Sequence, residues 1–143
     1  MKKIALPFVA MLAITLSADD PLWLTDLPKA QAKAKAEKKL VLLDFTGSDW
    51  CGWCIKLKKE VFTKPEFVDY SKENLVLVEV DFPRNKKLSP PQQKANDALA
   101  EKYKVEGFPT LIVLNSEGKK IGELGYVEGG PKPFLQKLAK LKK

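Results

Sequence analysis

The chain has 143 residues, a length that fits one domain with its own hydrophobic core, so neither disulfides nor metals are needed as scaffolding. Its hydrophobic content of 45% excludes a disordered chain. The formal charge is +7, but the lysines are spread among acidic residues. We interpret them as solvated helix faces and expect no nucleic-acid partner.

The N-terminus has the order of a secretory signal peptide. Two lysines precede the almost wholly apolar residues 4–16, and small residues follow up to Ala18. An apolar stretch this short does not span a membrane, and the proline within it argues against the alternative, a buried helix. We expect a signal peptide at 1–18 and a mature domain at 19–143 in the periplasm, with no stable membrane insertion after the signal is removed.

The mature chain begins with a lead-in around Trp23 that we expect to be exposed. Thr25 or Asp26 is suited to cap a helix, because strong helix formers fill residues 30–39. The apolar run at residues 41–45 predicts a strand that is covered on both faces. The first elements are therefore a capped helix and a buried strand.

The next segments complete a βαβ unit. Residues 55–62 have apolar side chains at helical spacing, and Pro65 is expected to end or bend that helix. A second apolar, β-branched run at residues 75–81 predicts another strand. Strand, helix and strand in this order predict parallel strands with a right-handed crossover.

The second half of the chain predicts a helix, a hairpin and a closing helix. Two prolines open a helix through residues 92–103, and residues 110–115 and 119–127 form an antiparallel pair around a Ser-Glu-Gly turn. Residues 134–141 then place apolar side chains at helical spacing, with lysines opposite. An anionic membrane is an alternative contact for such a basic amphipathic helix, and packing on the sheet is favoured.

The only two cysteines, Cys51 and Cys54, enclose Gly52 and Trp53 in a Cys-Gly-Trp-Cys motif. A structural zinc site takes four Cys or His ligands, and the chain has no His. Covalent haem attachment needs a histidine where Ile55 stands, and an iron–sulfur cluster would need cysteines from a second chain. We expect no metal, and no cofactor other than a disulfide between these cysteines.

This disulfide is either structural or redox-active. A bridge that closes so short a loop constrains the unfolded chain little, so it contributes little to stability. The pair follows a buried strand and opens a helix, where unpaired N–H groups and the helix dipole favour a thiolate. Cys51 is expected to be exposed and to attack first, and Cys54 to be more buried and to act second. A redox-active pair is favoured.

Two motifs together carry a resemblance to a known family. Trp50-Cys-Gly-Trp-Cys54 follows the first predicted strand, and Gly107-Phe-Pro-Thr110 precedes the third. Over roughly residues 40–142 the chain resembles the thioredoxin superfamily, and its Ser-Asp-Trp-Cys-Gly-Trp-Cys stretch resembles the exported, periplasmic DsbH type. The resemblance implies an α/β thioredoxin fold: a βαβ unit, then a helix, a β-hairpin and a C-terminal helix around a mixed central sheet.

The resemblance also implies roles for single residues. Cys51 corresponds to the nucleophile and Cys54 to the resolving cysteine. Pro109 corresponds to a proline in a cis peptide bond beside the disulfide, where the backbone of Phe108 pairs with an extended substrate. An ordinary proline at a strand entry is the alternative.

The same resemblance implies that Trp50, Gly52 and Trp53 border the substrate-contact surface, although core packing is an equal alternative for Trp53. The two residues between the cysteines include no histidine, which in oxidising relatives stabilises the reduced thiolate. We therefore favour a reductase or isomerase over a disulfide-donating oxidase.

Asp44 corresponds to a buried strand acid that helps move the proton of the resolving cysteine. Two features depart from the family pattern. The segment 46–50 is one residue longer than the commonest spacing, and Leu77 stands where a neighbouring lysine is common. A strained or solvated acid at a strand end is therefore the alternative for Asp44.

Together these features predict a thiol-disulfide oxidoreductase of the cell envelope. Its expected partners are protein thiols and disulfides, and an upstream redox partner that recharges the cysteine pair. The alternative from another class is a non-catalytic thioredoxin-fold module that binds polypeptides by its aromatic rim. We expect a monomer, because the sequence contains no additional dimerisation segment.

Overall fold

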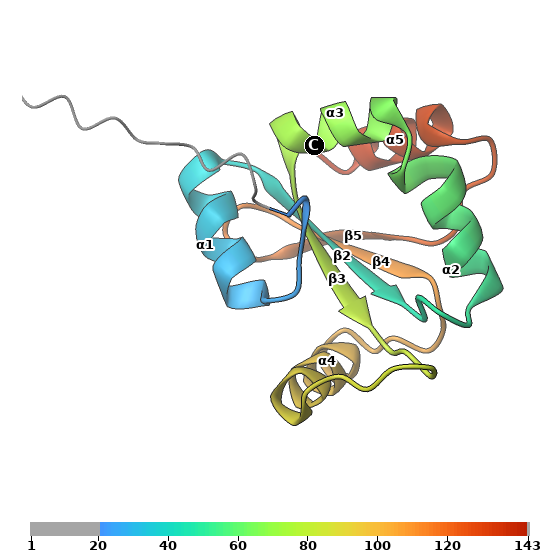
Figure 1. Ribbon diagram of the computed structural model, residues 1–143. Helices are drawn as coiled ribbons and strands as arrows, with labels where there is room; N and C mark the ends of the chain where they lie inside the picture. Colours follow the sequence, from blue (N-terminus) through green and yellow to red (C-terminus); the bar gives the residue numbers. More distant parts are fainter. Residues whose placement is uncertain (1–20, 143) are drawn as a thin grey trace, which may run out of the picture.

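The computed structural model describes residues 21–142 (Figure 1). The signal-peptide prediction at 1–18 therefore lies outside the described residues. In chain order the elements are β1 (Trp23–Leu24), α1 (Leu27–Glu37), β2 (Leu40–Thr46), α2 (Gly52–Leu57), the π-helix η1 (Lys58–Phe62), α3 (Pro65–Asn74), β3 (Leu75–Asp81), α4 (Pro90–Lys102), β4 (Thr110–Leu114), β5 (Lys120–Leu124) and α5 (Pro131–Lys140).

The strands form one mixed sheet in the order β1-β3-β2-β4-β5. β2 and β3 are parallel, as predicted, whereas β4 is antiparallel to β2 and forms a hairpin with β5. Helices cover both faces of the sheet, with α2, α3 and α5 on one face and α1 and α4 on the other (Figure 1). The predicted thioredoxin fold is confirmed.

Each face of the sheet has its own hydrophobic core. Because successive strand residues point to opposite faces, Leu42 of β2 belongs to the core under α2 and α5, and Leu43 to the core under α1 and α4. On α5, Phe134 and Leu138 are fully buried, and each contributes roughly 2 kcal/mol to folding. This burial confirms that the closing helix packs on the sheet.

The start of α1 follows its capping pattern. Asp26 is the N-cap, and its Oδ1 accepts a hydrogen bond from the Lys29 N–H at 3.0 Å. Such a cap stabilises a helix by about 1 kcal/mol. Lys38, in the left-handed conformation, ends the helix and turns the chain into β2.

The expectation that Trp23 is an exposed lead-in is wrong. It lies in β1, which pairs with β3 so that Trp23 is aligned with Leu77. Its ring lies 5.0 Å from that of Phe62 and 6.4 Å from that of Phe67. A strand of two residues is too short to produce a periodic pattern, so only its distant contacts reveal it.

The predicted helix at residues 55–62 is two segments in the structure, and a further helix follows it. The helix begins at Gly52, continues from Lys58 as the π-helix η1, and is followed by α3, which the sequence analysis missed. Pro65 does end the preceding segment, but it also occupies the first turn of α3, where its missing N–H costs nothing. Within residues 21–142, none of the helices is long and apolar enough to cross a membrane.

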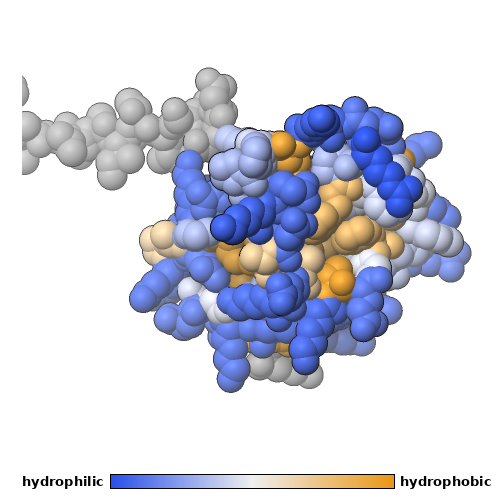
Figure 2. Space-filling view, turned by 90° about the horizontal axis from the view of Figure 1, so that it is seen from below, coloured by the Kyte–Doolittle hydropathy of each residue, from blue (hydrophilic) through white to orange (hydrophobic). Residues whose placement is uncertain are grey.

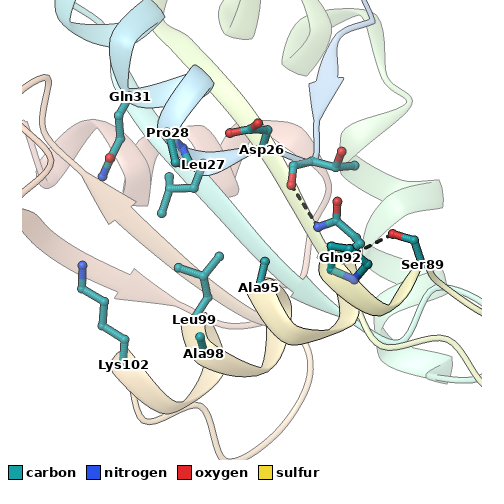
Figure 3. A pocket seen from close by; sticks show the side chains of 12 residues that line it. Asp26, Leu27, Pro28, Gln31, Ser89, Gln92, Ala95, Ala98, Leu99 and Lys102 are labelled. Carbon is teal, nitrogen blue, oxygen red and sulfur yellow. Dashed lines mark hydrogen bonds between the residues drawn. The ribbon is translucent and has the colours of Figure 1, made fainter.

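The side of the molecule that faces down in Figure 1 is largely hydrophilic, with apolar residues gathered in its middle (Figure 2). A groove of 610 Å³ lies between α1 and α4 and is lined by apolar residues such as Leu27 and Leu99 (Figure 3). The Gln92 Nε2 on α4 donates to the Thr25 carbonyl at 3.2 Å. None of the predicted site residues lines this groove, which is the seam between two helices on one sheet face.

Candidate active site

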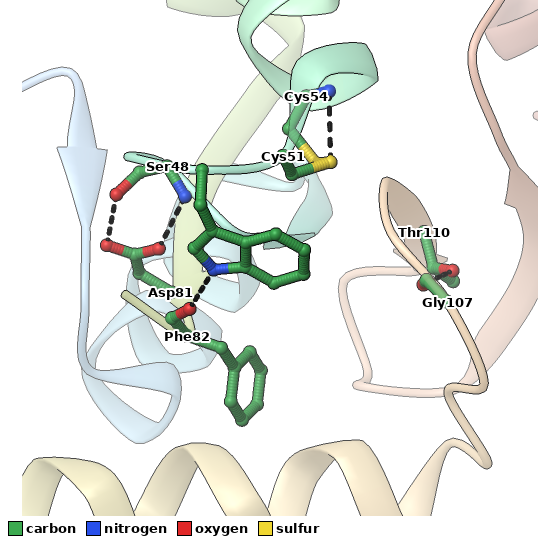
Figure 4. The surroundings of a disulfide bond; sticks show 8 residues. Ser48, Cys51, Cys54, Asp81, Phe82, Gly107 and Thr110 are labelled. Carbon is green, nitrogen blue, oxygen red and sulfur yellow. Dashed lines mark hydrogen bonds between the residues drawn. A yellow bond between two sulfur atoms is a disulfide. The ribbon is translucent and has the colours of Figure 1, made fainter. Parts of the chain in front are cut away.

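The cysteine pair lies where α2 begins, just after the end of β2. Cys51 is the N-cap of α2, and a disulfide joins it to Cys54, with the two Cα atoms 5.2 Å apart (Figure 4). The Cys54 N–H donates to Cys51 Sγ at 3.2 Å. An amide donor at this sulfur stabilises negative charge on it, as a nucleophilic thiolate requires.

The expectation that Cys51 is exposed is wrong for the disulfide form. Cys51 is 7% exposed and Cys54 is 5% exposed. The reason is geometric, because the capping position and the bond to Cys54 fold the Cys51 side chain back onto the first turn of α2. A protein substrate therefore has to fit the residues around the pair in order to reach its sulfur atoms.

The segment before Cys51 forms a tight turn. The N–H groups of Trp50 and Cys51 both donate to the Gly47 carbonyl, at 3.2 and 2.8 Å. The Ser48 N–H donates to Asp81 Oδ1 on β3 at 2.9 Å (Figure 4). The segment between β2 and Cys51 is thus a turn that is anchored to β3.

The same turn fixes the loop that follows β3. The Asp49 carboxylate accepts from the backbone N–H groups of Arg84 and Asn85, both at 2.9 Å. The hydrogen bond from Arg84 is the main reason that the pKa of Asp49 lies below its usual value. Trp50 Nε1 donates to the Phe82 carbonyl at 2.7 Å. Two segments distant in sequence are thereby held together beside the cysteines.

Gly47 allows Trp50 to approach this turn. A Cβ at position 47 would lie 2.7 Å from Trp50 Nε1, so Gly47→Ala has to displace the indole and break its hydrogen bond to Phe82. We expect Gly47→Ala to lower the free energy of unfolding by ~1–3 kcal/mol in denaturant titrations. Gly125→Ala is the control, because a Cβ there meets no described atom within 4 Å. Equal losses in both variants would contradict the role of the Trp50 contact.

Aromatic side chains flank the pair on the side of Trp50. The rings of Trp50 and Phe108 meet edge to face at 6.0 Å, and Phe82 stacks on Phe108 at 5.2 Å. The Arg84 guanidinium lies 3.7 Å from the centre of the Trp50 ring. The Phe108–Pro109 peptide bond is cis. Phe108 therefore links the proline turn to the segment that carries the cysteines.

The Trp53 side chain, between the two cysteines, is exposed rather than packed in the core, with 57% of its surface accessible. Its ring lies 5.0 Å from that of Tyr126, and Lys56 Nζ lies within 5.4 Å of both ring centres. The Tyr126 hydroxyl donates to Glu60, and this hydrogen bond is the main cause that raises the pKa of Tyr126 to about 12. Tyr126 and Lys56 thus pack against Trp53, which presents an aromatic surface next to the disulfide.

Asp44 lies on the face of the sheet that α2 covers. It is 7% exposed, and its Oδ1 has no hydrogen-bond partner among the residues that the structure describes. Burial first, and then the nearby carboxylates of Glu79 and Asp81, raise the pKa of Asp44 from 3.8 to about 7. Asp44 and Cys54 line the same cavity of 180 Å³. The acid and the second cysteine therefore meet at one cavity, despite the doubt raised by the predicted spacing of residues 46–50.

The neighbour of Asp44 on β3 is Glu79, and the assignment of Leu77 to that position is wrong. The parallel register aligns Asp44 with Glu79, and Leu42 with Leu77. Both strands are nearly continuous apolar runs, so their pattern does not specify how they are aligned. Asp44 consequently faces a second acid, not an apolar side chain.

Comparison with known proteins identifies the family. The sequence model of the thioredoxin-like domain matches residues 27–142. The chain belongs to the thioredoxin-like family. It is 37% identical over 110 residues to the disulfide bond reductase DsbH of Chlamydia pneumoniae, an alignment that covers 77% of this chain and 66% of DsbH.

Two further comparisons agree with this family assignment. The thioredoxin-related protein DsbJ of Chlamydia pneumoniae is 33% identical over 108 residues, 76% of this chain and 31% of DsbJ. The solved structure of a DsbH oxidoreductase superimposes with a TM-score of 0.78 at 35% identity, covering 83% of this chain and 82% of that one. This thioredoxin-like chain thus spans about two thirds of the length of DsbH and under a third of DsbJ.

Besides Glu79, we did not predict Phe82, Arg84 and Tyr126 as residues of this thioredoxin-like site. A signal existed for Phe82 and Arg84, which directly follow β3, because the carboxyl ends of parallel strands meet at one edge of a sheet. No local motif marks Tyr126, whose contact with Trp53 depends on where the hairpin of β4 and β5 returns.

Proposed function

We propose that this protein is a thiol-disulfide oxidoreductase that exchanges disulfides with protein substrates through Cys51 and Cys54, acting as a reductase or isomerase. One arrangement carries this proposal. The disulfide lies at the start of α2, and the cavity lined by Cys54 is also lined by Asp44, whose Oδ1 has no hydrogen-bond partner within residues 21–142. The similarity to DsbH, named a disulfide bond reductase, supports the reducing direction.

In the proposed reaction the Cys51 thiolate attacks one sulfur of a substrate disulfide and displaces the other sulfur as a thiolate. Cys51 and the substrate are then joined in a mixed disulfide. Cys54 gives its proton to Asp44, attacks Cys51 Sγ and releases the substrate sulfur. The pair is left oxidised, so an upstream redox partner has to reduce it, and no cofactor beyond the pair itself takes part.

The surroundings of the pair suit an extended polypeptide substrate. Trp50 and Phe108, which contact each other, and the exposed Trp53 offer apolar surface near the disulfide. The backbone at Phe108, before Pro109, is proposed to pair with the substrate main chain. Gly52 leaves room for this chain, since a Cβ there would meet no described atom within 4 Å.

Trp53→Ala is expected to weaken binding of protein substrates without slowing the chemistry. Removing an exposed aromatic anchor should raise KM for insulin by about tenfold, or ~1.4 kcal/mol, while kcat changes little. Steady-state insulin reduction measures both constants. Reduction of a small aliphatic disulfide, which has no aromatic group to stack on Trp53 and little surface to contact it, is the control and should be unchanged. An unchanged KM for insulin would remove Trp53 from the substrate surface.

We further propose that residues 1–18 direct export and that the mature chain acts as a monomer in the periplasm. The periplasm is an oxidising compartment in which protein disulfides form and persist, so it contains substrates for the proposed exchange. The order of charge, apolar residues and small residues before Ala18 supports the export signal.

Insulin reduction with dithiothreitol as the electron donor tests the proposed function. The purified mature protein should accelerate reduction over dithiothreitol alone, and its reduction potential should lie well below the value of about −120 mV that marks a strong oxidase. A potential near that value would favour the oxidase alternative. Capture of unfolded polypeptides without any acceleration would favour the non-catalytic binding module.

A further inference from the structure

Glu79 is a half-buried acid that the reaction above does not use. It is aligned with Asp44 across the parallel strands β2 and β3, so the two side chains leave the sheet on the same face. Both acids line the 180 Å³ cavity, together with Cys54 and Lys58. The cavity thus contains the second cysteine, a buried acid and an acid that is partly open to solvent.

Asp44 needs a route by which it loses its proton. Because Asp44 is 7% exposed and its Oδ1 is buried, bulk water has little direct access to it. An acid that stays protonated after one exchange cannot accept the next proton. Glu79 is both adjacent and more exposed, and two neighbouring carboxyl groups readily share a proton because ionising both is unfavourable.

We propose that Glu79 relays the proton of Cys54 from Asp44 to solvent, and that Lys58 balances the charge of this acid pair. The inference rests on the proposed exchange reaction. The Cys54 thiol gives its proton to the Asp44 carboxylate, and the Cys54 thiolate forms a bond to Cys51 Sγ. The bond between Cys51 and the substrate breaks, and its electron pair leaves on the substrate sulfur. Asp44 then passes the proton to the Glu79 carboxylate, which releases it to water.

The charged groups around this pair come from β3, from η1 and from the loop after β3. Besides burial, Glu79 and Asp81 of β3 raise the pKa of Asp44, whereas Lys58 of η1 lowers it. The pKa of Glu79 is also raised, by burial first and by Asp81 second, against the lowering effects of Lys58 and Lys86. Lys58 is therefore the cation that acts on both acids.

A carboxyl NMR titration of the oxidised protein tests this charge balance without depending on turnover. Glu79→Gln removes a negative neighbour, so the midpoint of the Asp44 titration should fall, and Lys58→Met should raise it, each by about half a pH unit or more. Glu60→Gln and Lys59→Met remove the same charges outside the cavity and should shift the midpoint less. Equal shifts in variants and controls would overturn the assignment.

The rate of the resolving step tests the relay itself. Release of a substrate thiol from the mixed disulfide with Cys51 is followed by stopped flow across pH. We expect Glu79→Gln to slow release about tenfold near neutral pH, and Glu79→Asp to retain most of the rate. Thermal unfolding of each variant identifies any loss of folding, in which case the Lys58→Met titration still decides the charge assignment.

Two failures are distinguishable. Equal release rates in Glu79→Gln and the unmodified protein, across the whole pH range, would overturn the relay and leave the exchange reaction intact. Failure of the unmodified protein to form or resolve any mixed disulfide would instead overturn the proposed function. A slower rate with the same pH dependence in Glu79→Gln and Glu60→Gln would also overturn the relay, because it would indicate a general loss of negative charge.

Discussion

Cys51→Ser is expected to reduce insulin reduction to the rate of the reductant alone, whereas Cys54→Ser is expected to accumulate a covalent complex with the substrate. A serine hydroxyl forms no disulfide, so without Cys51 no mixed disulfide begins. Without Cys54 the first attack still occurs, but nothing displaces the substrate from Cys51. Non-reducing electrophoresis measures the complex, and added dithiothreitol should dissolve it.

The two serine variants are matched controls for each other. Both remove the same disulfide, which closes so short a loop that its loss costs only about 2 kcal/mol in a chain-entropy description. A difference between them therefore reports the order of attack rather than stability. Accumulation of the complex in Cys51→Ser instead of Cys54→Ser would reverse the assigned roles, and undiminished insulin reduction by both variants would contradict a redox pair.

The sequence predicted the elements that have strong local signals. β3 runs over Leu75–Asp81 as expected, because apolar β-branched residues fill it and turn residues bound it. α4 begins at Pro90 after the Ser89 cap, as its prolines indicate. The position of Cys51 and Cys54 at the start of a helix followed from the order of these elements. The local sequence was therefore sufficient to predict most of the helices and strands.

The remaining features depend on contacts between distant residues. β1 consists of two residues, and its pairing with β3 has no periodic signal. The continuous apolar runs of β2 and β3 left their register open, so Leu77 was assigned in place of Glu79. The support of Trp53 by Tyr126 joins a helix start to a loop more than seventy residues later. No local pattern encodes such contacts, which arise when the layers pack.

The burial of Asp44 was expected from its place in a covered strand, but the rise in its pKa was not, and this rise leads to the second large effect. Asp44→Asn is expected to stabilise the oxidised protein at neutral pH. In the unfolded chain the pKa is near 3.8, but it is about 7 in the folded protein. Between these values the unfolded chain is ionised and the folded protein stays protonated, so the stability of the unmodified protein falls as pH rises.

The size of the expected stabilisation follows from the shift in the pKa of Asp44. A rise in pKa from 3.8 to about 7 opposes folding by roughly 4 kcal/mol above pH 7, at 1.36 kcal/mol per unit. Asparagine does not ionise, so the advantage of Asp44→Asn should grow by about this amount between pH 4 and pH 8 and then level off. Denaturant unfolding across pH measures it. Asp69→Asn, which alters an exposed acid on α3, should show no comparable change.

Asp44→Asn should also slow the resolving step, because it removes the acceptor for the Cys54 proton. We expect a loss of about 10- to 100-fold near neutral pH, at the lower end of what a positioned base contributes. The defect should shrink toward about pH 8.5, where a free thiol ionises without a base. A defect that stayed constant with pH would instead indicate a displaced cysteine. Greater stability together with slower resolution at one pH would mean that the fold keeps a destabilising buried acid for its reaction.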